Sequence, residues 1–119
     1  RCIDISERIG RDYDLIISLH FNSFNKIANG CEAFYWHSND AGFKHAKKFV
    51  DSYCKLTGSR PRGAKAYNFN SKGKLPRGAG EVYYTKSTTI LLEPFFGDNK
   101  EDCERFDKDK FIKSIKNVI

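Results

Sequence analysis

Two short apolar runs, each ending on an ionisable residue, constrain the fold of this chain most strongly. The first is DLIISLH, residues 14–20, and the second is TTILLE, residues 88–93. Runs of this length, rich in Ile and Leu and bounded by polar residues, are typical of buried strands. His20 and Glu93 therefore stand at the carboxyl ends of strands, which is where the working residues of α/β sheets lie.

The segment between these runs predicts a strand followed by a helix. CEAFYWH, residues 31–37, has the composition of a strand, and SND, residues 38–40, offers a helix N-cap. Apolar residues then recur at helical spacing until Gly58: Phe43, Ala46, Val50, Tyr53 and Cys54. Strands that alternate with helices indicate an α/β fold, with a twisted, mostly parallel sheet and helices on both faces.

The remaining segments give weaker signals. Residues 1–12 are expected to be the end of a helix, and residues 22–30 are rich in turn formers. Residues 59–80 hold two prolines, several glycines and six basic side chains, and predict a long loop of the functional or mobile kind. EVYY, residues 81–84, predicts a further strand.

The C-terminal segment predicts a helix. Asp98 and Glu101 have the spacing of a capping box at its start. The side chains expected to form its buried stripe are Phe106, Ile112, Ile115 and Ile119.

Composition narrows the class of protein without identifying it. The 119 residues suit one modest domain, and 39% hydrophobic residues are enough for a core. The net charge of +6 favours polyanionic partners: nucleic acid, anionic membranes or anionic cell-wall polymers. No secretory leader and no apolar run of membrane-spanning length is present.

Four cysteines stand far apart: Cys2, Cys31, Cys54 and Cys103. They form no CxxC pair, which argues against a cysteine-rich zinc site. We interpret them as reduced and partly buried thiols, with two long-range disulfides as the alternative.

Taken alone, the two residues at strand ends leave alternatives open. A neutral imidazole such as His20 is a good zinc ligand, but partly buried histidines are also common structural residues. Burying a carboxylate on a strand costs free energy of folding unless an opposite charge pairs with it, so such a residue is retained either for an ion pair or for a function. Glu93 is therefore either a functional carboxylate or one half of a salt bridge.

Three ordered segments together resemble a known family. DLIISLHFNS resembles the "aDLfiSIHaNs" segment of the zinc-dependent N-acetylmuramoyl-L-alanine amidases of the family-3 type, found in bacterial autolysins and phage endolysins. ANGCEAFYW, residues 28–36, resembles the "anGvEvyy" strand of that family. Residues 83–102 resemble its "yVLr.t..PavLvE.GFisN.eD" segment. The residues that match there are Glu93, Phe96, Asn99, Glu101 and Asp102.

The resemblance implies a reaction, a metal and a set of site residues. Such enzymes cleave the amide between N-acetylmuramic acid and L-alanine in peptidoglycan by zinc-assisted hydrolysis. His20 matches the second of two zinc-binding histidines, and Glu93 matches the catalytic glutamate. Asn22 would shape the site. Arg62 matches the "RG" before the substrate-side loop, and Tyr84 would line the groove.

The resemblance also implies a missing part. In the family, one histidine and one glutamate ligand lie upstream of the position of His20, and neither His37 nor His45 matches them. We therefore expect residues 1–119 to be the C-terminal portion of a single amidase catalytic domain, with a sheet incomplete at its N-terminus. Pro94 and Phe95 depart from the family pattern after the glutamate, and we expect them to reshape the floor of the pocket.

The expected partner is peptidoglycan, with action at the bacterial cell wall and no membrane partner. The basic residues of 60–77 could form a rim for anionic wall polymers, beside aromatic residues able to stack on sugar: Tyr67, Phe69, Tyr83 and Tyr84. Two alternatives use the same residues. One is a non-catalytic wall-binding domain of the same fold, and the other is a basic nucleic-acid-binding module, for which no recognised motif is present.

Overall fold

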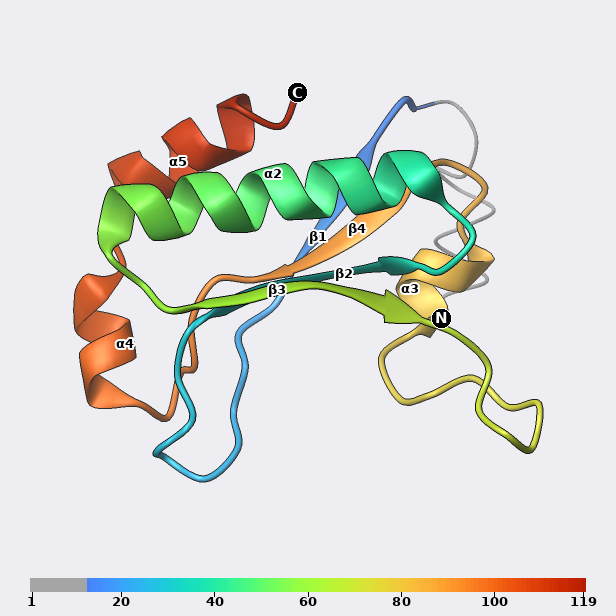
Figure 1. Cartoon of the computed structure of the whole chain (residues 1–119), viewed down its shortest axis with the longest axis horizontal. Coiled ribbons are helices and arrows are strands. Elements are labelled where there is room, and N and C mark those ends of the chain that lie inside the picture. Colours follow the sequence, from blue (N-terminus) through green and yellow to red (C-terminus); the bar gives the residue numbers. More distant parts are fainter. Residues whose placement is uncertain (1–12) are drawn as a thin grey trace.

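The computed structural model describes residues 13–119, which are built around a four-stranded sheet (Figure 1). Its strands are β1 (Ile16–Leu19), β2 (Cys31–Trp36), β3 (Pro61–Tyr67) and β4 (Thr89–Glu93), in the order β1-β4-β2-β3. The pairs β1–β4 and β2–β3 are parallel, whereas β2 and β4 are antiparallel. The predicted α/β class with a mostly parallel sheet and flanking helices is confirmed. The helix expected over residues 1–12 lies outside the described residues.

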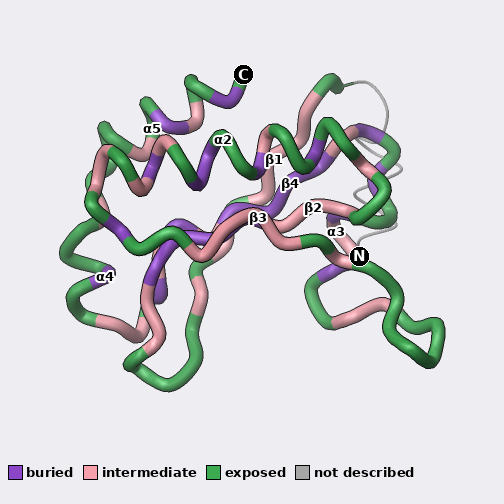
Figure 2. Tube along the Cα trace, in the orientation of Figure 1, coloured by how far each residue is buried: buried purple, intermediate pink, exposed green. Residues whose placement is uncertain are grey.

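One face of the sheet packs on α2 (Asp40–Thr57), as Figure 1 shows. Asn39 caps this helix by accepting a hydrogen bond from the Gly42 N–H at 2.9 Å, and Gly58 ends it with a φ of 75°. In the hydrophobic core, the buried side of α2 packs against alternate residues of the strands, among them Ala33, Ile90 and Leu92. The buried stripe of α2 includes Phe49, whereas Phe43 is 41% exposed, contrary to the sequence prediction. Figure 2 shows buried residues along β4 and the inner turns of α2.

The C-terminal region forms two helices, α4 (Lys100–Arg105) and α5 (Lys108–Lys116). Asp107 caps the start of α5 by accepting a hydrogen bond from the Lys110 N–H at 3.0 Å. Because the chain breaks between α4 and α5, the residues that face inward differ from those of one continuous helix. The predicted stripe is therefore wrong in part: Ile112 and Ile119 are exposed. The inward-facing residues of α5 and the tail are Phe111, Ser114, Ile115 and Val118.

Two other predictions between residues 59 and 84 are wrong. The expected loop contains β3, which begins at Pro61 and pairs with β2, so that the true loop spans only residues 68–79. EVYY belongs to the short helix α3 (Gly80–Tyr84), not to a strand. Val82 is buried there, while Glu81 faces the sheet and accepts a hydrogen bond from the Ser18 hydroxyl at 2.5 Å. Packing against the sheet overrides the strand preference of these residues.

A buried carboxylate, Asp102, joins two distant turns of the chain. Its Oδ2 accepts the backbone N–H of Gly30 at 3.0 Å and that of Phe96 at 2.7 Å. Asp102 is 1% exposed, and its own N–H is bound by Asn99, the N-cap of α4. The predicted capping box of Asp98 and Glu101 is thus replaced by an Asn99 cap one residue later.

Asp98 has a different role from the one predicted. Its carboxylate accepts the N–H groups of Phe24 and Lys26 at 3.0 and 3.1 Å, and Asn99 donates to the carbonyls of Lys26 and Ile27. Residues 98–99 therefore hold the loop after β1 in place. Within residues 13–119, no helix has the length and hydropathy that a membrane crossing requires.

Replacing Asp102 tests this bridging role. Asp102→Ala leaves two buried N–H groups without their acceptor, and each such group costs about 1–3 kcal/mol. We expect a loss of about 2–6 kcal/mol in the free energy of unfolding, measured by urea denaturation. Glu101→Ala, which removes an 81% exposed carboxylate from the same helix, is the control and should change stability little. Equal stability of the two variants would contradict the bridging role.

Candidate active site

Adjacent strand ends bring His20 and Glu93 together. The register of the parallel pair β1–β4 runs from Ile16↔Thr89 to Leu19↔Leu92. His20 continues this ladder, since its N–H donates to the Leu92 carbonyl at 2.9 Å. The prediction that both residues stand at the carboxyl ends of strands is confirmed, and the structure shows in addition that these strands are neighbours.

A third residue, Glu32, lies at the same edge of the sheet. Strand β2 runs antiparallel to β4, so its first residues meet the end of β4, and Glu32 pairs directly with Glu93. Glu32 is not among the site residues predicted from the sequence. The available signal was its charge at the second position of an otherwise apolar strand, CEAFYW.

Glu32 is buried, with 5% exposure, among three donors. The Lys65 ammonium makes a short hydrogen bond to Oε1, Arg62 Nε donates to the same oxygen at 3.3 Å, and Asn22 Nδ2 donates to Oε2 at 2.6 Å. Burial by itself raises the pKa of Glu32, but the hydrogen bonds from Lys65, Asn22 and Arg62 outweigh it and hold the pKa below its ordinary value. Glu32 therefore stays ionised beside Glu93.

Glu93 has the opposite electrostatic character. Burial raises the pKa of Glu93, and the negative charge of Glu32 raises it further. His20, a hydrogen bond from the Asn22 side chain and Lys65 offset only part of this effect. A carboxylate with a raised pKa is a better proton acceptor and donor near neutral pH than an ordinary glutamate.

Asn22 is held between these two carboxylates by the backbone. It forms a parallel bridge with Phe96, in which its N–H donates to the Phe95 carbonyl at 3.1 Å and its carbonyl accepts from Gly97 at 2.7 Å. Its side-chain amide then donates to Glu32 Oε2 at 2.6 Å and lies near enough to Glu93 to lower the pKa of that carboxyl. The predicted site residue Asn22 is thus brought beside Glu93 and into contact with Glu32.

His20 contacts a second carboxylate, that of Glu81 in α3. Its Nε2 lies 2.8 Å from Glu81 Oε2 and 3.0 Å from the Ser18 hydroxyl. A nucleophilic Ser–His–Glu triad needs the hydroxyl and the carboxylate on different ring nitrogens. Here both contact Nε2, so these residues do not have the geometry of a triad.

The donor chemistry around His20 fits part of a zinc site. Zinc binds imidazole nitrogen, which His20 supplies, and the Glu81 carboxylate contacts the same ring as the carboxylate beside a zinc-binding histidine commonly does. Among residues 13–119, no cluster of three or more His, Cys, Asp or Glu side chains is arranged to hold a metal ion. The described cysteines, Cys31, Cys54 and Cys103, are free thiols.

The two predicted substrate residues lie at different places. Arg62 lies beside Glu32 and donates a hydrogen bond to it. Its guanidinium carbon lies over the Phe96 ring, 5.0 Å from the ring centre. Tyr84 lies on α3, one turn after Glu81, and its ring contacts Tyr83 at 5.0 Å. Only Arg62 of these two touches a residue of the Glu32–Glu93 pair.

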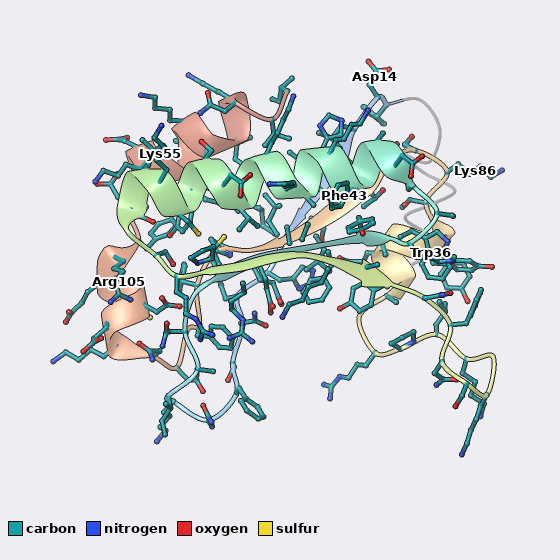
Figure 3. All side chains as sticks on the ribbon, viewed as in Figure 1. Asp14, Trp36, Phe43, Lys55, Lys86 and Arg105 are labelled. Carbon is teal, nitrogen blue, oxygen red and sulfur yellow. The ribbon has the colours of Figure 1, made fainter. Side chains whose placement is uncertain are left out.

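Aromatic side chains gather at the other end of β2. The rings of Trp36, Phe69 and Tyr83 contact one another at centroid distances of 4.7–5.2 Å. Figure 3 shows Trp36 beside α3, at the end of the sheet opposite Arg105. Phe34 lies between these rings and Glu32 along β2 and stacks on Tyr67 at 4.6 Å. On the face of the sheet opposite α2, the side chains along β2 therefore change from the charged Glu32 to the aromatic Phe34 and Trp36.

Comparison with solved structures identifies this architecture. The catalytic domain of the CD27L endolysin targeting Clostridia difficile is 26% identical, with a TM-score of 0.71 over 98% of this chain and 60% of that one. The catalytic domain of CwlV, an N-acetylmuramoyl-L-alanine amidase from Bacillus (Paenibacillus) polymyxa var. colistinus, is 21% identical, with a TM-score of 0.71 and the same coverage. An N-acetylmuramoyl-L-alanine amidase from Clostridium difficile 630 is 18% identical, with a TM-score of 0.79 over 99% of this chain and 62% of that one.

This chain thus spans about 60% of the length of the solved chains that it resembles. A comparison with curated proteins finds no match. The sequence pattern of one protein family, Amidase_3, described as N-acetylmuramoyl-L-alanine amidase, matches residues 4–119. The chain therefore belongs to this amidase family of peptidoglycan hydrolases.

Proposed function

We propose that residues 1–119 form the C-terminal portion of an amidase catalytic domain that cleaves the bond between N-acetylmuramic acid and L-alanine by zinc-assisted hydrolysis. The observation that carries this proposal is the half-buried Glu93, whose pKa is raised, beside His20 at the ends of two neighbouring parallel strands. Family membership supplies the substrate class.

In this proposal His20 is a zinc ligand, and the remaining protein ligands come from outside residues 13–119. Zinc, when bound, supplies Lewis-acid activation of the scissile carbonyl and of the attacking water. Glu93 accepts the proton of that water and returns it to the leaving amine, for which its raised pKa suits it. Asn22 orients the Glu93 carboxylate, and Glu81 orients the His20 ring.

Glu93→Gln tests the proton-transfer role. Glutamine keeps the size and polarity of the side chain but cannot accept the proton, so we expect amidase activity of the full-length protein to fall at least about 100-fold. Zinc content should stay unchanged. In the wild type, activity should decline on acidification at a higher pH than an ordinary glutamate would give, because the raised pKa of Glu93 makes it protonate sooner. Turnover at the wild-type level in Glu93→Gln would remove Glu93 from the mechanism.

His20→Ala tests the metal ligand. A zinc site of the catalytic type holds its metal with three protein ligands, so the loss of one should lower zinc affinity sharply. Zinc retained after dialysis against a chelator is the measurement. His37→Ala removes an exposed histidine and is the control. Equal zinc retention in both variants would show that His20 binds no metal.

We also propose that the loop of residues 68–79 contacts anionic groups of the cell wall. Lys72, Lys74 and Arg77 are exposed on this loop, which projects from the sheet on the side opposite α2 (Figure 1). Arg60 and Arg62, which sequence analysis assigned to the same loop, lie elsewhere: Arg60 precedes β3 and Arg62 contacts Glu32.

Replacing Lys72, Lys74 and Arg77 by glutamine should weaken binding to purified wall. The difference from the wild type should shrink as salt is added, because exposed charges are screened beyond about 10 Å at an ionic strength of 0.1 M. The matched control replaces Lys44, Lys48 and Lys55, which lie on α2. Equal weakening in both triple variants would indicate an effect of net charge alone.

A further inference from the structure

The buried carboxylate of Glu32 has no part in the proton transfer assigned to Glu93. It is 5% exposed and carries a charge that Lys65, Arg62 and Asn22 keep in place. Removing a carboxylate from water costs several kcal/mol, and buried ion pairs usually recover little more than that cost. An apolar residue at this strand position would serve folding about equally well. The stability of the sheet therefore does not account for Glu32.

The position of Glu32 is unfavourable for Glu93 unless a donor lies between them. The two residues are direct partners across β2 and β4, and like charges directly opposite each other destabilise a sheet. A primary amide has two N–H hydrogens and can donate to two acceptors. Asn22 places its amide here: Nδ2 donates to Glu32 Oε2 at 2.6 Å, and the same side chain is close enough to Glu93 to lower the pKa of that carboxyl.

We propose that Glu32 is a positioning residue, which fixes the Asn22 amide so that Asn22 holds the Glu93 carboxylate in its working orientation. This inference rests on the proposed function, since it gives Glu93 a catalytic role. Asn22 is anchored by its backbone to Phe95 and Gly97, but these bonds leave the rotation of its side chain free. Glu32 supplies the missing constraint because Lys65 and Arg62 fix its other oxygen, Oε1.

Lys65 and Arg62 complete the arrangement from β3. Both bind Glu32 Oε1, which leaves Oε2 for Asn22. Arg62 is further fixed by its hydrogen bond to the Asn29 carbonyl at 3.4 Å and by the Phe96 ring. The chain of contacts from β3 through Glu32 and Asn22 to Glu93 thus consists of side chains on strands or on bridged backbone, which is where a site can be held rigidly.

Glu32→Gln in the full-length protein tests the proposal. The substitution keeps the shape but removes the charge that orders Lys65, Arg62 and Asn22. We expect kcat to fall about 10- to 100-fold with KM nearly unchanged, because a misplaced catalytic group affects the chemical step and leaves substrate contacts intact. Zinc content should stay at the wild-type level. Glu104→Gln, with the same charge change on the exposed side of α4, is the control.

Asn22→Ala provides a second variant, which breaks the link but leaves the ion pairs of Glu32 with Lys65 and Arg62 in place. Because Glu32 acts through Asn22, the double variant should be no slower than Asn22→Ala alone. Multiplicative losses in the double variant would overturn the proposal, as would a wild-type kcat in Glu32→Gln. If Glu32→Gln does not fold, Asn22→Ala must lose about 10- to 100-fold in kcat at constant KM, and a wild-type kcat in it would overturn the proposal.

Crystal structures of the two single variants give a readout that needs no activity. The proposal expects the Glu93 carboxylate to adopt another rotamer, or several, in both. An unchanged Glu93 position in both would overturn it. A wild-type protein without amidase activity would refute the proposed function and leave this structural outcome to decide on the positioning role.

Discussion

The arrangement of this protein depends on the buried carboxylate of Asp102. It binds the Gly30 N–H two residues before Glu32 and the Phe96 N–H three residues after Glu93. These two segments are more than 60 residues apart in the sequence, yet a single oxygen atom fixes both. Since Asp102 lies in the first turn of α4, a helix outside the sheet determines where two strands present their glutamates. Buried N–H groups need an acceptor, and Asp102 supplies one for both Gly30 and Phe96. The same two hydrogen bonds fix the segments that carry Glu32 and Glu93.

The mixed topology of the sheet explains why three ionisable side chains, His20, Glu93 and Glu32, meet at the same end of the sheet. In a purely parallel sheet only carboxyl ends share an edge, and His20 and Glu93 satisfy that rule on β1 and β4. Strand β2 runs the other way and contributes its beginning, Glu32, to the same edge. Its far end then places Trp36 beside α3. A single antiparallel pairing therefore produces both the carboxylate pair and the charged-to-aromatic gradient along β2.

The parts of the fold that sequence could predict are those in which local pattern and tertiary context agree. β1, β4 and α2 have apolar runs or helical spacing together with clear caps at Asn39 and Gly58. β3 was missed because PRGAKAY has the composition of a turn. It is an edge strand, where proline at the first position is tolerated. His20, Asn22 and Glu93 could be found from strand ends and the family resemblance. The contacts of Glu32 and Glu81 could not, because they depend on register and on a helix that sequence assigned to a strand.

The electrostatics of the site follow from an unequal sharing of cations. Lys65 and Arg62 both lie on β3, which pairs with β2 and not with β4, so their charges reach Glu32 first. Lys65 therefore lowers the pKa of Glu93 only slightly, and burial, which raises that pKa, has the largest effect. If the cations were placed on β1 instead, Glu93 would be the paired carboxylate and would lose its affinity for a proton. The strand order β1-β4-β2-β3 therefore separates the two glutamates into one that stays charged and one that can exchange a proton, without any difference in their chemistry.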